Sequence, residues 1–164
     1  MADGGASTFI LLITALLVSG SVSAVLIDQW GDMSGALEEN RKGKEADAKT
    51  SLSFAGDAME VDYDDSVNPN EMTFYLQNSG QYVLDEDTLV VMVDGVSVTS
   101  SISATILPGG AEWTDTRLLE VVVSSSSWSY QNDDTLSISA VVSSEITSGY
   151  RGTDTMNIEV RLDV

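Results

Sequence analysis

The first part of the chain is dominated by an uninterrupted apolar run. Residues 4–27 carry no charged side chain, and residues 9–27 read FILLITALLVSGSVSAVLI. Apolar residues occur on every side of a helix drawn through this run, and its 19 residues would span about 28 Å, close to the ~30 Å hydrocarbon core of a bilayer. The pattern predicts a helix surrounded by lipid or by other helices.

A secretory signal peptide is the alternative interpretation of this run. Val22-Ser23-Ala24 fits the small-residue pattern of a cleavage site. Signal peptides start with a basic segment, whereas here Asp3 precedes the run and no Lys or Arg does. We therefore expect the helix to be retained.

Helical spacing continues beyond the apolar run. Trp30, Met33 and Leu37 recur at intervals of three and four residues, and a charged run follows at 38–49. Residues 1–49 are therefore predicted to form a membrane-anchoring helix and stem, a plan that is similar to the N-terminal part of pilin-like proteins. Small residues four apart allow close helix packing, and Trp favours a membrane interface. The residues predicted to mediate membrane or helix packing are Phe9, Ile10, Ala15, Ser19, Gly20, Ser23, Ala24 and Trp30.

From about Thr50 onward, the spacing of apolar positions changes from about 3.6 to 2. Alternating runs, separated by turns such as Asp94-Gly95, predict seven or eight strands. Their apolar positions lie at 61–63, 72–76, 89–93, 96–98, 102–106, 119–123, 136–142 and 156–162. This pattern is typical of an antiparallel immunoglobulin-like β-sandwich. The prediction is an α+β protein, with a long N-terminal hydrophobic helix followed by a sandwich head domain at residues 50–164.

The charge lies mainly in the head domain. The whole chain has 26 acidic and 7 basic residues, a formal charge of −19, whereas residues 50–164 hold 19 acids and 3 bases. Acidic residues this widely spread favour a surface that stays hydrated in strong salt, and a binding site for cations or basic partners is the alternative. Nucleic acid is excluded as a partner, because neutralising phosphates requires Lys and Arg.

Composition also limits the possible chemistry. The chain has no His and no Cys, which excludes a Ser-His-Asp triad, a Cys nucleophile, disulfides and ordinary zinc or haem sites. No phosphate loop or nucleotide fingerprint occurs. Acidic clusters at 62–65, 85–87 and 133–134 could supply oxygen ligands to a hard cation, but none has EF-hand spacing. We predict no catalytic residue, no cofactor and no metal.

Three aromatic residues of the head domain are candidates for contact with a partner protein. They are Trp113, Trp128 and Tyr130. Packing at the edge of the sandwich is the alternative role for Trp128 and Tyr130.

Two segments resemble archaellum accessory proteins, especially the FlaG family. Residues 6–18 are similar to the opening helix of that family. Residues 74–80, followed by Leu84 and then by 91–95, are similar to its strand, Asn-x-Gly, Leu and Val-Asp-Gly pattern, which archaellins share. Archaellins and pilins carry a basic residue and then Gly at the cleavage site before the helix. Here Asp3 precedes Gly4, which favours an accessory protein over a processed filament subunit.

The resemblance implies a membrane-anchored stator or accessory protein of the archaeal flagellum (the archaellum). The head domain would lie outside the cell, between the membrane and the surface layer. It would form homo- or hetero-oligomers with a FlaF-like protein, the motor or the surface layer, while the helix contacts membrane lipid. The basic residues at 41–44 favour a cytoplasmic head by the positive-inside rule, but three nearby acids offset them, so we follow the resemblance.

Two other functions remain open. One is a filament-forming archaellin or type IV pilin-like subunit whose helix packs in a filament core. The other is a membrane-anchored β module that binds a cation or a ligand.

Overall fold

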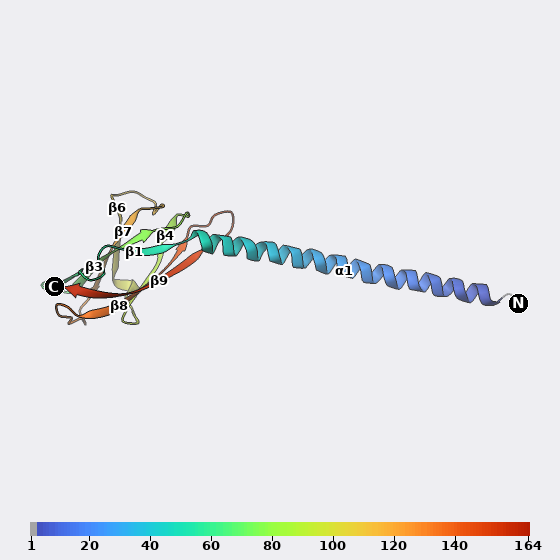
Figure 1. Cartoon of the computed structure of the whole chain (residues 1–164), viewed down its shortest axis with the longest axis horizontal. Helices are drawn as coiled ribbons and strands as arrows, with labels where there is room; N and C mark the ends of the chain where they lie inside the picture. The colour runs from blue at the N-terminus through green and yellow to red at the C-terminus, as the bar shows by residue number, and fades with distance from the viewer. Residues whose placement is uncertain (1–2) are drawn as a thin grey trace. The chain divides into compact units, whose positions relative to one another are not determined.

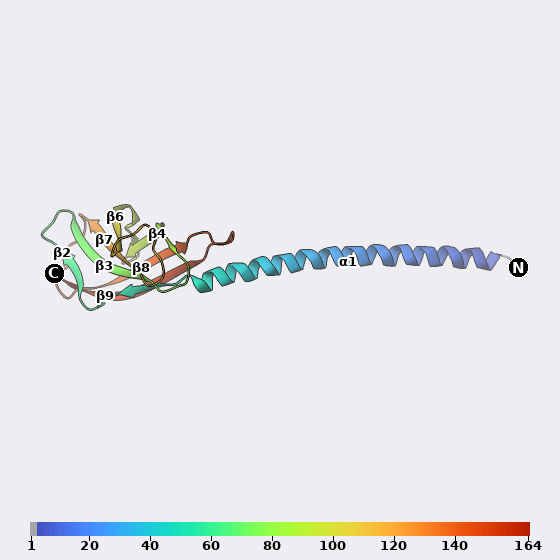
Figure 2. The ribbon, with the colours of Figure 1, turned by 90° about the horizontal axis from the view of Figure 1, so that it is seen from above.

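The computed structural model describes residues 3–164 and the side chains from residue 5 onward. It contains a long helix followed by a mostly antiparallel β-sheet structure (Figures 1 and 2). This confirms the predicted α+β fold class. The chain divides into two compact units, one ending at Arg41 and the other running from Lys42 to Val164.

Helix α1 extends from Asp3 to Lys49. Proline does not occur before position 69, so nothing interrupts the backbone hydrogen bonds of the helix. In its polar part, Glu38 pairs with Arg41 at 2.9 Å and Glu45 pairs with Lys49 at 2.6 Å. The helix ends where the Thr50 side chain and backbone turn back, with Oγ1 donating to the Ala46 carbonyl (2.9 Å) and N–H donating to the Asp47 carbonyl (3.1 Å).

Nine strands follow in the described part of the chain. They are β1 (Leu52–Ala55), β2 (Val61–Asp64), β3 (Asn70–Asn78), β4 (Leu84–Val93), β5 (Val96–Ser97), β6 (Ile102–Leu107), β7 (Leu118–Ser125), β8 (Thr135–Ser144) and β9 (Thr153–Asp163). A short 3₁₀ helix, η1 (Thr99–Ser101), leads into β6. All eight predicted apolar runs fall in or beside these strands, and β1 is the one that the pattern missed.

The strands form two layers that share one core. One layer has the order β6-β7-β3, with β1 and β2 lying along the other edge of β3, and the second has the order β5-β4-β8-β9. Alternate residues of both layers are buried, for example Phe74 (1% exposed) on β3 and Ile138 (0%) on β8. Because side chains alternate across a strand, these inward faces build the apolar centre of a sandwich.

The two sides of the sandwich differ. On one side β2 pairs in parallel with β9, joining Val61 to Leu162, and this pairing links the two layers. On the other side β6 pairs only with β7, and the neighbouring part of β4 leaves its regular register between Asp85 and Val90. This second side is called the open seam below.

Candidate functional site

The apolar part of α1 is the largest exposed apolar surface of the chain. Phe9, Ile10 and Trp30 are 66%, 64% and 70% exposed, and none of the most apolar helical window is buried. By length and composition α1 is able to cross a membrane. A helix that is apolar on all sides needs an apolar surrounding, supplied by lipid or by other helices.

The small residues predicted to mediate helix packing are also open. Ala15, Ser19, Gly20, Ser23 and Ala24 are exposed, and a Cβ added at Gly20 would meet nothing within 4 Å. Polar side chains in this region bond to the helix itself: Thr14 Oγ1 donates to the Ile10 carbonyl, at 2.9 Å. Ser21 does the same toward the Val18 carbonyl, so these two hydroxyls have partners within the helix, as an apolar surrounding favours.

At its other end, α1 is fixed by close backbone contacts. This junction, formed by residues 42–50 and the loops at 78–82 and 152–154, lies wholly within the unit that begins at Lys42. Ala46 is 2% exposed, and a Cβ on Gly152 would lie 2.2 Å from its carbonyl oxygen. A Cβ on Gly80 would lie 2.5 Å from the carbonyl oxygen of Lys49. Only glycine permits so close an approach.

Asn78 is the organising side chain of the junction. It is fully buried, and its Nδ2 donates to the carbonyls of Tyr82 and Trp113, both at 2.8 Å. Its Oδ1 accepts the Gly80 N–H at 3.0 Å. Every polar atom of this amide therefore has a partner. The Asn-x-Gly sequence that carried the family resemblance is thus the loop that holds the end of α1.

Two carboxylates complete the junction. Asp47 of α1 accepts the N–H of Thr153 at 3.1 Å, and Asp154 accepts the N–H of Leu52 at 2.8 Å. The carbonyl of Lys49 accepts N–H groups from Gln81 (2.7 Å) and Tyr82. The last carbonyls of a helix lack partners within it, so these bonds cap α1 and tie it to the strands.

The three aromatic candidates have different positions. Trp113 is 1% exposed, and its Nε1 donates to the Arg117 carbonyl at 2.9 Å. It belongs to the core, so the expectation that it contacts a partner is wrong for the folded chain. Trp128 and Tyr130 are half-buried and form an aromatic cluster with Tyr63, with ring centroids 6.5 and 5.7 Å from the Tyr63 ring. Their packing at the sandwich edge leaves only part of each ring exposed.

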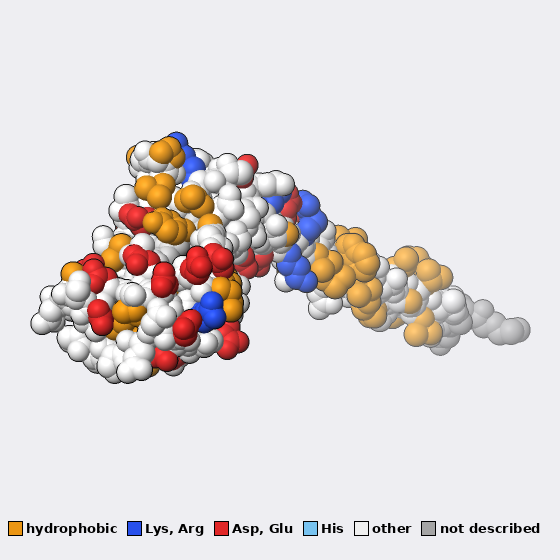
Figure 3. Space-filling view, turned by 60° about the vertical axis from the view of Figure 1, so that its left-hand side comes forward, with side chains coloured by type: hydrophobic (Ala, Val, Ile, Leu, Met, Phe, Trp, Pro, Cys, Tyr) orange, Lys and Arg blue, Asp and Glu red, His pale blue; other side chains and the backbone are white. Residues whose placement is uncertain are grey.

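The acidic side chains are scattered over the face of the head domain shown in Figure 3. Among the described residues, no group of three Asp or Glu side chains converges as metal ligands would. Several carboxylates have local partners instead: Asp64 accepts from Ser66, and Asp85 pairs with Arg151 at 2.9 Å. The bonds from Ser66 lower the pKa of Asp64 below its ordinary value.

Sequence reasoning missed the junction. Ala46, Gly152 and Asp154 come from segments that lie far apart in the sequence, and each is an ordinary residue type in its own run. The apolar alternation at 72–76 places Asn78-Ser79-Gly80 at the end of a strand, and β3 does end at Asn78. Its contact with α1 depends on pairing between β1 and β3, which no local pattern specifies.

The chain thus combines a long helix with an exposed apolar surface and an acidic β-sandwich. The family model for archaeal-type flagellin matches residues 2–164. The chain therefore belongs to the archaeal-type flagellin family, whose role is structural. This confirms the predicted relationship to the archaellum, and it does not distinguish a FlaG-type accessory protein from a filament subunit.

Individual known proteins give no further information about the family or the function of the chain. A search of the curated proteins finds no match. Among solved structures, the chain is similar to AggA, the major subunit of aggregative adherence fimbriae type I from Escherichia coli, at 12% sequence identity and a TM-score of 0.29, over 69% of this chain and 92% of AggA. A similarity at this level carries no argument about function.

Proposed function

We propose that this chain is a filament-type subunit of the archaellum, which assembles with other subunits through α1 and carries out no catalysis. In this form its helix packs among the helices of neighbouring copies, while the sandwich forms the outer surface. Family membership supports the relationship to the archaellum, and one observation carries the assembly role: the fully exposed apolar surface of residues 9–27.

Two features of α1 agree with packing among helices. Its small residues at 15, 19, 20, 23 and 24 are uncovered, so a second helix can approach its backbone closely. The junction then holds the head domain on the last turns of each helix, because Gly80, Gly152 and Asn78 leave those turns no room to shift.

Purified filaments test this proposal. Filaments sheared from cells should contain the chain in stoichiometric amount, and mass spectrometry of its N-terminus should show that the first few residues have been removed. A deletion strain should lack filaments and fail to swim. Cells that swim normally without the chain would overturn any role in motility.

A membrane-anchored accessory protein is the second candidate. The observation that favours it is Asp3 immediately before Gly4, where the archaellin processing site has a basic residue. In this form α1 lies in the membrane, the sandwich lies between membrane and surface layer, and a FlaF-like protein, the motor or the surface layer is its partner. The chain would then be absent from sheared filaments, would keep residues 1–4, and would remain with the membrane fraction.

A further inference from the structure

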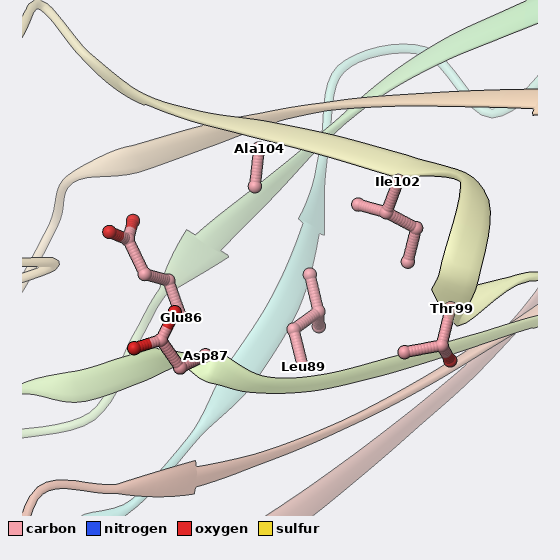
Figure 4. A pocket seen from close by; sticks show the side chains of 6 residues that line it. All are labelled: Glu86, Asp87, Leu89, Thr99, Ile102 and Ala104. Carbon is pink, nitrogen blue, oxygen red and sulfur yellow. The ribbon is translucent and has the colours of Figure 1, made fainter.

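The open seam carries features that assembly through α1 does not use. A cavity of about 310 Å³ lies there, lined by Glu86, Asp87 and Leu89 of β4, Thr99 of η1, and Ile102 and Ala104 of β6. Figure 4 shows Ile102 and Ala104 directed from β6 toward β4, with Leu89 directed back toward them. Leu89 itself is buried in the core, so the exposed lining of the cavity is mainly polar, with Ile102 and Ala104 as its apolar part and Glu86 and Asp87 at its acidic end.

The backbone beside this cavity is unpaired. β6 hydrogen-bonds only to β7, and Ser103, Ala104 and Thr105 at its centre are exposed. Across the seam, residues 86–89 have left the ladder with β8, where Thr88 Oγ1 accepts the Ser143 N–H at 3.0 Å in place of a backbone carbonyl. Edge strands are usually prevented from pairing with other chains by charged residues, by proline or by being very short. In contrast, β6 has six residues and contains neither a charged residue nor proline.

The charged side chains that line the seam are acidic, and two arginines border it: Arg151, and Arg117, whose guanidinium donates to the Glu112 carbonyl at 3.4 Å. A second cavity, of about 130 Å³, adjoins the first through Glu86 and Asp87 and is also lined by Asp85, Glu112 and Glu145. Asp85 is paired with Arg151. Among the described residues that line the two cavities, none is Lys or Arg. The seam is therefore complementary to a cationic segment, and two copies of this acidic chain would repel each other there.

We propose that β6 accepts an added strand from a different protein, an extended segment with alternating apolar side chains and Lys or Arg at its end. Backbone bonds to β6 would hold the segment. Its inward side chains would cover Ile102 and Ala104, because alternate residues of an added strand face the cavity. Its basic residue would reach Glu86 and Asp87. This surface is independent of how α1 assembles.

The test uses the full chain in detergent micelles and a fluorescently labelled peptide with both ends capped, Lys-Thr-Val-Thr-Val-Thr-Lys. Binding of the peptide is measured by fluorescence anisotropy at low salt. Lys and Val share one side of this peptide as a strand. We expect saturable binding that the double substitution E86Q/D87N weakens about fivefold, because charged contacts near a surface are partly screened. The control E159Q/D163N removes the same charge on β9 and should leave binding unchanged.

Two further peptides test the backbone bonds without altering the protein. One is N-methylated at its odd-numbered amides and the other at its even-numbered amides. Only one set of amides faces β6 in a strand, so the two peptides should differ at least tenfold in affinity. Hydrogen exchange should slow at residues 103–105 when the unmethylated peptide binds.

Four results would overturn the proposal. They are no saturable binding, equal weakening by the two double substitutions, equal affinity of the two methylated peptides, and self-association of the chain that the peptide displaces. The last would assign the seam to a second copy. Each can occur whether or not the chain assembles through its helix.

Discussion

At the residue scale, the junction depends on groups that have no room to change. Gly152 and Gly80 lie against the helix backbone, and Asn78 satisfies three backbone groups in a place that water does not reach. Overpacking and lost buried hydrogen bonds are the two mechanisms that make single substitutions costly at such sites.

Gly152→Ala should destabilise the head domain by about 2–4 kcal/mol, since its Cβ would meet the Ala46 carbonyl oxygen and Thr50 Oγ1, both 2.2 Å away. Denaturant unfolding followed by Trp fluorescence measures this. Gly43→Ala is the matched control: a Cβ there meets nothing within 4 Å in a helix, so stability should rise by up to about 1 kcal/mol. If Gly152→Ala lowered the free energy of unfolding no more than Gly43→Ala does, the close contacts described for the junction would be contradicted.

Asn78→Ala should cost about 2–4 kcal/mol, because the Gly80 N–H and the Tyr82 carbonyl lose their side-chain partner and the Trp113 carbonyl keeps only the Leu84 N–H. The same unfolding measurement applies. Asn157→Ala, at an exposed position of β9, should stay within about 0.5 kcal/mol of the parent chain. If both substitutions had equally small effects, Asn78 would not organise the loop.

Tyr130 should make the chain sensitive to alkaline pH. Burial, together with the charge of Asp94 and the bond to its carboxylate, raises the pKa of Tyr130 above its ordinary value. Below the unfolded-state pKa of about 10 both states are protonated, so the contribution is fully present. As pH rises beyond that value the unfolded chain loses its proton first, and stability falls. Tyr130→Phe should flatten the fall in Tm between about pH 9 and pH 11. An unchanged fall would exclude this side chain as its source.

At the scale of elements, α1 combines two surroundings in one continuous helix. Its first part is exposed and apolar, whereas its last turns meet the loops at 78–82 and 152–154, and the compact units divide between Arg41 and Lys42. The apolar part was predictable, because periodicity alone shows a helix with no polar face. The helix ends at Lys49, next to the point near Thr50 where the spacing of apolar residues changes from about 3.6 to 2.

Gly20→Leu should weaken association between copies of α1 by about tenfold, because a large side chain keeps helix backbones apart at a small-residue contact. Association between the chains is measured by fluorescence resonance energy transfer between labelled copies in detergent. Val18→Leu is the control, since at about 100° per residue Val18 lies about 160° around the helix from Gly20 and about 140° from Ser23. Equal effects of the two substitutions would mean that the small residues do not define the contact.

At the scale of the whole molecule, charge is the dominant property. The chain carries −19, and residues 50–164 hold 19 acids against 3 bases. Most of these acids are exposed, so their mutual repulsion opposes the folded state and falls as salt screens it.

Raising NaCl from about 0.1 M to about 2 M should therefore raise the Tm of the head domain by several degrees, most of it below about 1 M, where the Debye length shortens from about 10 Å to about 3 Å. Scanning calorimetry measures this. Sucrose at matched osmolality is the control for exclusion effects. A Tm that rises equally in sucrose, or not at all in salt, would contradict an electrostatic cause.

The sequence by itself determined which parts are helix and strand, because apolar periods of about 3.6 and 2 are properties of single segments. It also determined the anchor-like helix and the acidic head, since both are matters of composition. Only the tertiary structure decided that Trp113 is core, that Asn78 and Gly80 hold the end of α1, and that β6 remains an open edge. These depend on which strands become neighbours, and that choice is made by the packing of distant segments around one core.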